Sequence, residues 1–78
     1  MNEPLPKFAV YEGYEIRPAP YQVISSKWKL HVIIRKNDGA SITEIPFTAS
    51  NEFDSREEAS KHCFQFAKKL IDDGSVVI

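Results

Sequence analysis

The chain has 78 residues, of which 42% are hydrophobic, 12% aromatic and 27% charged. This composition is typical of a folded protein and excludes the disordered class, and the length leaves no room for a second core. Ten Lys and Arg against eleven Asp and Glu give a net charge of -1, so no overall positive field draws the protein toward nucleic acid or anionic lipid.

Two absences favour the cytoplasm as the compartment. The single cysteine, Cys63, cannot form an internal disulfide, and no charged-then-apolar leader opens the chain. The apolar runs, such as residues 32–34, are far shorter than the roughly 20 residues of a membrane-spanning helix. We therefore expect a cytoplasmic protein without a membrane partner.

Residues 1–10 are expected to form a flexible N-terminal arm, followed by a single domain of residues 11–78. The first strand of that domain has apolar positions at Tyr14, Ile16 and Pro18, which alternate with Glu15 and Arg17. Because proline cannot donate to a strand ladder, the prolines at positions 18 and 20 should end this strand or place it at an edge.

Residues 28–35 form the clearest predicted strand, because apolar and mostly cationic residues alternate along it. The apolar positions are Trp28, Leu30, Val32 and Ile34, and the alternate positions are Lys29, His31, Ile33 and Arg35. Asn37 and Gly39 tolerate positive φ, so the chain should reverse there into a return strand over residues 40–49. Pro46 indicates an edge position or a bulge in that strand.

The periodicity changes to that of a helix after Phe53. Ser55 and Glu58 form a capping box at its start, and Gly74 stands where a left-handed C-cap belongs. The apolar stripe of this helix, which has about five turns, comprises Ala59, Cys63, Phe66, Ala67 and Leu70.

Together these elements predict an α+β fold: a three-stranded antiparallel meander with one C-terminal helix packed on one face, in the order βββα. Residues 75–78 either add a short C-terminal strand or cover the helix end.

The neighbours His62 and Cys63 are the first candidates for chemistry. Adjacent residues leave a helix in different directions, and Cys63 lies within the apolar stripe, so packing in the core is favoured over catalysis. Two histidines and one cysteine do not supply the four ligands of a structural zinc site, and no glycine-rich or nucleophile-elbow motif occurs. We expect no enzyme activity, no catalytic residue, no metal and no cofactor.

The sheet face away from the helix is the remaining candidate site. Its predicted binding residues are Arg17, Lys29, His31, Ile33 and Arg35, with Ile42 among them. A cationic face with interleaved apolar residues can bind single-stranded nucleic acid or a protein. Glu15 and Glu44 dilute the charge and no aromatic residue clearly lies on the face, which favours protein because nucleic-acid platforms normally use aromatic stacking.

The chain resembles known protein families in four motifs: "YEGYEIRPAPY", "VIIRKNDG", "PFTA" and "LIDDG". Between Tyr11 and Gly74 the chain resembles a small bacterial family of single-domain βββα proteins of uncharacterised function. More distantly, it is similar to the HlyU-type transcriptional activators. The resemblance implies the βββα fold and a regulatory role, and it transfers no catalytic residue.

These observations predict a small non-enzymatic binding or adaptor domain. It would act through its open sheet face on a protein partner, or by self-association as a homodimer. The alternative is a nucleic-acid-linked transcriptional regulator of the HlyU type that uses the cationic residues of the same face.

Overall fold

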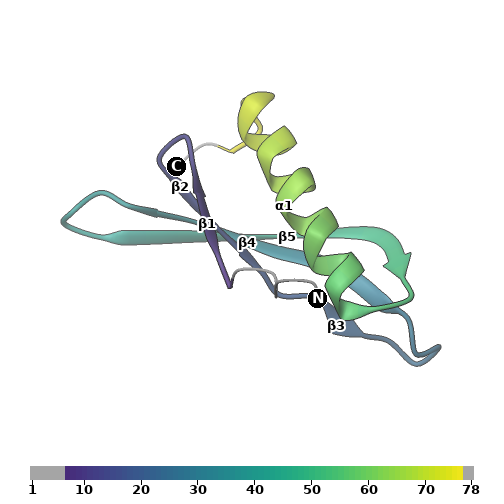
Figure 1. The fold of residues 1–78 in the computed structure, drawn as a ribbon. Helices are drawn as coiled ribbons and strands as arrows, with labels where there is room; N and C mark the ends of the chain where they lie inside the picture. The colour runs from purple at the N-terminus through teal and green to yellow at the C-terminus, as the bar shows by residue number, and fades with distance from the viewer. Residues whose placement is uncertain (1–6, 77–78) are drawn as a thin grey trace, which may run out of the picture.

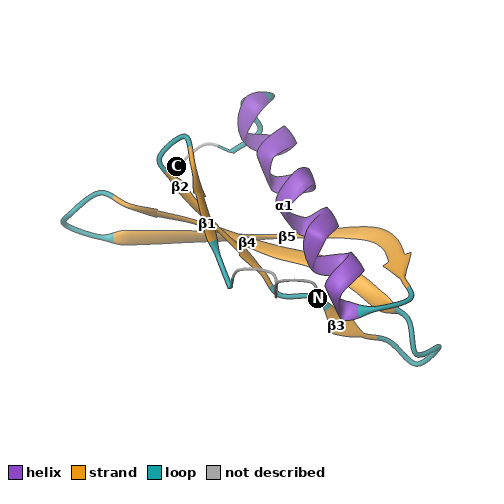
Figure 2. Ribbon diagram, in the orientation of Figure 1, coloured by secondary structure: helices purple, strands orange, loops and turns teal. Residues whose placement is uncertain are grey.

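The computed structural model describes residues 7–76, which form two layers, an antiparallel sheet and one helix (Figures 1 and 2). The elements in chain order are β1 (Ala9–Tyr11), β2 (Tyr14–Pro18), β3 (Tyr21–Gln22), β4 (Trp28–Asn37), β5 (Ile42–Phe53) and α1 (Arg56–Asp72). The α+β class with one C-terminal helix is confirmed. The prediction of three strands is wrong, because the sheet has five.

The strand β1 lies partly where the sequence predicted an arm. Ala9 pairs with Ile16 of β2, and the two residues between the strands, Glu12 and Gly13, have φ angles of 52° and 82°. Positive φ at both central residues is characteristic of a tight two-residue hairpin. The ordered sheet therefore begins at residue 9 rather than 11, and residues 1–6 of the expected arm lie outside the described residues.

The strands β2 and β3 lie end to end and pair with the same edge of β4. Pro18 pairs with Val32 and Tyr21 with Lys29 in a continuous register, and between them the amide of Ala19 donates to the carbonyl of His31 at 2.8 Å. Backbone groups of alternate residues point to opposite edges of a strand. The two prolines beside Ala19 therefore face away from β4, so they interrupt the strand without removing a bond to β4.

The strand β5 is longer than predicted and bends near its end. Among the described residues it pairs only with β4, which confirms the edge position that Pro46 indicated. Between the pairs His31–Thr48 and Lys29–Glu52 the register shifts, so the segment of residues 49–51 lies opposite Leu30 alone. This bulge lets β5 curve toward the start of α1 (Figure 1).

The core lies between α1 and the covered face of the sheet. It is built by small side chains of the helix packed on branched side chains of β2 and β4. The buried residues are Ile16, Leu30, Val32, Ile34, Ala59, Cys63, Ala67 and Val76. No helix among the described residues is long and apolar enough to cross a membrane.

Both ends of α1 are capped as the sequence predicted. Ser55 Oγ accepts a hydrogen bond from the amide of Glu58 at 3.1 Å. Gly74 has a φ of 75°, and the amide of Ser75 donates to the carbonyl of Leu70 at 2.9 Å, as in a Schellman motif. Residues 75 and 76 form no strand, because Val76 turns into the core, and residues 77–78 lie outside the described residues.

Candidate functional site

The five residues predicted as a binding face lie together on the side of the sheet that is turned away from α1. Arg17 pairs with Ile33 across β2 and β4, and Lys29, His31 and Arg35 occupy alternate positions of β4. The intervening residues of β4 are buried beneath the helix. Because neighbours in a strand point to opposite faces, these five side chains share one surface, here called the open face.

The open face also carries Ile42, as the sequence predicted, and further apolar residues that the sequence analysis did not place there. Val10 is opposite Glu15, Tyr21 is opposite Lys29, and Ile42 is opposite Asn37. Among the described residues, the exposed large hydrophobic side chains lie on this face, except Ile24, which lies in the turn between β3 and β4. They are Phe8 (45% exposed), Val10 (70%), Tyr21 (44%), Ile24 (105%) and Ile42 (50%). The face is therefore more apolar than the sequence indicated.

Two aromatic rings correct the expectation that this face lacks aromatic residues. The ring of Tyr21 contacts that of His31 edge to face, with 5.9 Å between centroids. The guanidinium of Arg17 lies 5.2 Å from the ring centroid of Phe8. His31 Nδ1 also lies 2.7 Å from Thr48 Oγ1 of β5, so neighbouring strands hold its imidazole in place.

The charges of the open face are paired within it. Arg17 Nη2 donates to Glu15 Oε1 at 3.0 Å, and Arg35 Nε lies 3.7 Å from the other oxygen of Glu15 and 4.0 Å from Glu44 Oε2. Lys29 is directly opposite Glu52. The strands thus present equal numbers of cations and anions, which removes the cationic character expected from β4 alone.

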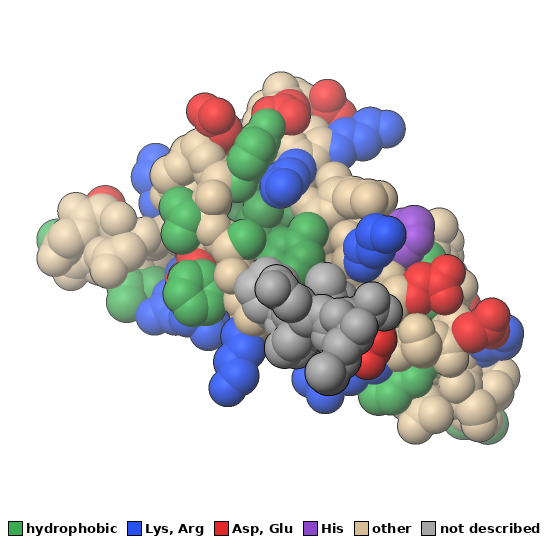
Figure 3. All heavy atoms as spheres, in the orientation of Figure 1, with side chains coloured by type: hydrophobic (Ala, Val, Ile, Leu, Met, Phe, Trp, Pro, Cys, Tyr) green, Lys and Arg blue, Asp and Glu red, His purple; other side chains and the backbone are tan. Residues whose placement is uncertain are grey.

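Figure 3 shows Lys and Arg side chains along the border of the molecule that lies away from the helix. Hydrophobic and acidic side chains lie between them. The mixture agrees with the pairing of charges found in the contacts.

Cys63 lies on the opposite side of the sheet from the imidazole of His31. Its side chain is fully buried, and Sγ donates to the backbone carbonyl of His31 at 3.2 Å. Burial raises the pKa of the Cys63 thiol. The ring of His62 is stacked on Phe53, with 4.5 Å between centroids. Cys63 therefore packs in the core, as the sequence predicted, without a histidine placed as its base.

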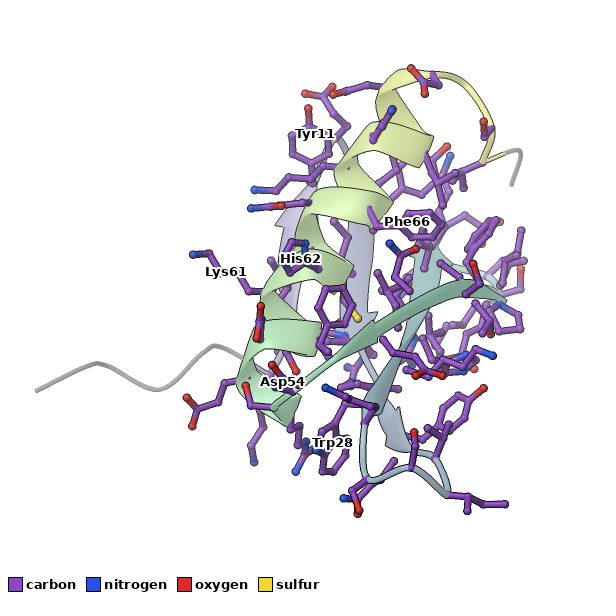
Figure 4. All side chains as sticks on the ribbon, turned by 90° about the vertical axis from the view of Figure 1, so that its right-hand side faces the viewer. Tyr11, Trp28, Asp54, Lys61, His62 and Phe66 are labelled. Carbon is purple, nitrogen blue, oxygen red and sulfur yellow. The ribbon has the colours of Figure 1, made fainter. Side chains whose placement is uncertain are left out.

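A hollow of about 210 Å³ lies between α1 and β5. It forms where β5 bulges away from the register, and Figure 4 shows Phe66 pointing from the helix toward the strands. Its lining residues are Leu30, Asn51, Phe53, His62, Gln65, Phe66 and Lys69. Sequence reasoning missed this hollow because it depends on the bulge.

No group of three or more His, Cys, Asp or Glu side chains within residues 7–76 is arranged to hold a metal ion. No protein-family model, no curated protein and no solved structure matches the chain. The open face and its contacts are thus the features on which a functional proposal can be built.

Proposed function

We propose that the protein is a non-enzymatic binding module that contacts another protein through the open face of its sheet. The observation that carries this proposal is the gathering of exposed Phe8, Val10, Tyr21 and Ile42 on one surface. Water around such a surface is released when a partner covers it, which favours association.

The balance of charge supports a protein as the partner. Glu15 lies between Arg17 and Arg35, and Glu44 lies 4.0 Å from Arg35, so two carboxylates within the face balance the two guanidinium groups. A phosphate backbone binds chiefly to uncompensated Lys and Arg, because its affinity comes from released counterions. Protein interfaces instead combine apolar centres with matched polar groups, as this face does.

A photo-crosslinking residue in place of Ile42 tests the proposal in the native host. The same residue in place of Lys61 is the control, because Lys61 is exposed on α1 and points away from the strands (Figure 4). We expect a protein adduct from position 42 and not from position 61. Ile33→Glu, which adds a charge at the centre of the open face, should abolish the adduct. Equal adducts from both positions would contradict the proposal.

The second candidate is a nucleic-acid-linked regulator, in line with the resemblance to HlyU-type activators. The observation that favours it is the placement of Tyr21 opposite Lys29 and of Phe8 against Arg17, since single strands require aromatic rings on which bases can stack. It predicts binding to single-stranded DNA or RNA that weakens with salt and is lost in Lys29→Glu and Arg35→Glu. Lys61→Glu is the matched control, and no binding at low salt excludes this candidate.

A further inference from the structure

Both edges of the sheet are protected against pairing with another strand. The hydrogen bond from Ala19 to His31 shows that the backbone groups of His31 point toward β2 and β3. The backbone groups of Val32 and Ile34 therefore point toward β5, where they meet those of Phe47 and Ile45. By this alternation Pro46 faces the free edge of β5, where its missing N–H interrupts the row of donors. The other edge is formed by β1, which has three residues, and by β3, which has two. Short strands and outward prolines oppose edge-to-edge association, so a contact of the sheet through its open face is favoured over one through its edges.

The open face has the layout of a small interface. A central, largely apolar band crosses the strands. It comprises Phe8, Ala19, Ile33 and Pro46, with Arg17 between Phe8 and Ile33 and His31 beside Ala19. Charged residues flank the band: Glu15, Arg35 and Glu44 on one side, and Lys29 and Glu52 on the other. An apolar centre with a charged rim is typical of surfaces that bury themselves against a partner.

The charges of this face are complementary to those of a second copy. A twofold axis along the strands, between β2 and β4, exchanges these two strands. It sets Glu15 opposite Arg35 of the partner subunit, because Glu15 and Arg35 are cross-strand neighbours. It likewise sets Tyr21 opposite Lys29 of the partner subunit, which places a cation on an aromatic ring. No two like charges of the open-face strands face each other in this arrangement.

We propose that the open face is the interface of a homodimer in which two sheets pack face to face about this axis. The inference rests on the proposed function and names its partner as a second copy of the chain. A stable interface buries about 800 Å² on each partner. The total surface of the chain is 5450 Å² and its two longer extents are 40 and 30 Å, so the open face has room for a contact of this size.

Charge reversal of the cross-strand pair tests this arrangement. Sedimentation velocity should show a dimer for the wild type, whereas Glu15→Arg and Arg35→Glu alone should each weaken self-association by at least about tenfold through like-charge repulsion. An equimolar mixture of the two variants should associate again, since opposite charges then meet across the interface. Lys61→Glu, a change of the same size on the far side of α1, should leave the dimer unchanged.

The mixture keeps the test independent of folding, because a variant that had lost its fold could not recover by mixing; circular dichroism checks each variant. A wild type that stays monomeric up to millimolar concentration overturns the homodimer. The binding module itself stands in that case if position 42 still captures a different protein. A dimer that is insensitive to both reversals also overturns the inference, and it moves the contact away from the open face.

Discussion

Cys63 carries a potentially reactive thiol, but in this fold the side chain serves to pack the core. Its thiol is buried beneath α1, and it donates to the backbone of the central strand β4. Burial favours the neutral thiol over the thiolate and so raises the pKa of Cys63. A thiol in this environment is protected both from solvent and from ionisation.

We therefore predict that Cys63 in the native protein reacts slowly with an alkylating reagent. The reaction should proceed only through unfolding, so its rate should rise steeply with urea and match that of the free thiol only in the unfolded chain. Mass spectrometry of alkylation over time measures this rate. Rapid labelling of the folded protein would show that the sulfur is accessible.

Asp38 gives a second prediction at the residue scale, in the turn between β4 and β5. Its carboxylate accepts from the amides of Ser41 at 2.9 Å and Ala40 at 3.1 Å, and these bonds lower the pKa of Asp38. A lowered pKa means that the folded state prefers the carboxylate. The stabilisation is fully present above the pKa of the unfolded chain and is lost as the pH falls through the folded pKa.

Asp38→Asn isolates this effect, because the amide keeps an acceptor oxygen and does not titrate. The wild type should have the higher free energy of unfolding at neutral pH. The difference should shrink as the pH falls from the pKa of the unfolded chain through the folded pKa of Asp38, and it should be lost below the folded pKa. Urea unfolding at several pH values measures it, and a difference that does not change with pH would show that the charge contributes nothing to the turn.

At the scale of the elements, the turn between β3 and β4 stores local strain. Ser26 has a φ of 68°, although it is not a glycine, and its amide donates to the carbonyl of Val23 at 2.9 Å. A side chain in the left-handed region costs about 1–2 kcal/mol relative to the right-handed region. Glycine adopts this conformation without that cost, but it adds entropy to the unfolded chain.

Ser26→Gly should therefore raise the free energy of unfolding by roughly 0.5 kcal/mol, the relief of strain less the entropic cost. The adjacent Ser25 does not have a positive φ, so Ser25→Gly should lower the free energy by about 0.5–1 kcal/mol. Thermal or urea unfolding of both variants provides the comparison. A loss of stability in both would contradict the strained geometry at Ser26.

Local sequence signals predicted those elements whose patterns are complete within one segment. The alternation from Trp28 to Arg35 established β4 and its two faces, and the caps at Ser55 and Gly74 bounded the helix. The prolines at positions 18 and 20 were expected to end the first strand or place it at an edge, and β2 does end at Pro18. Pairing along β4 resumes at Tyr21, because the missing donors of the prolines face away from β4.

The candidate site was predictable only in part for a similar reason. Alternation assigned Arg17 and the four residues of β4 to one face, and the structure places them there. The pairing of Glu15 with two arginines depends on the register between β2 and β4, which long-range packing sets. Continuing the alternation through Ala19 would have placed Tyr21 on this face.

At the scale of the whole molecule, the two faces of the sheet differ in what covers them. The helix buries one face, and Tyr11 of β1 ties the sheet to the helix end by donating to Asp72 Oδ1 at 2.7 Å. Among the described residues no element covers the other face (Figures 1 and 2). In the proposed homodimer a second sheet packs on this face, in the manner of a sandwich.

Amide chemical shifts recorded from micromolar to millimolar concentration test this account most directly. If two copies pack through their open faces, the shifts of β2 and β4 residues such as Arg17, Ile33 and Arg35 should change with concentration. Residues on the solvent side of α1, such as Lys61, should not change. Shifts that are independent of concentration throughout, or that change on the helix while the open face stays constant, would contradict it.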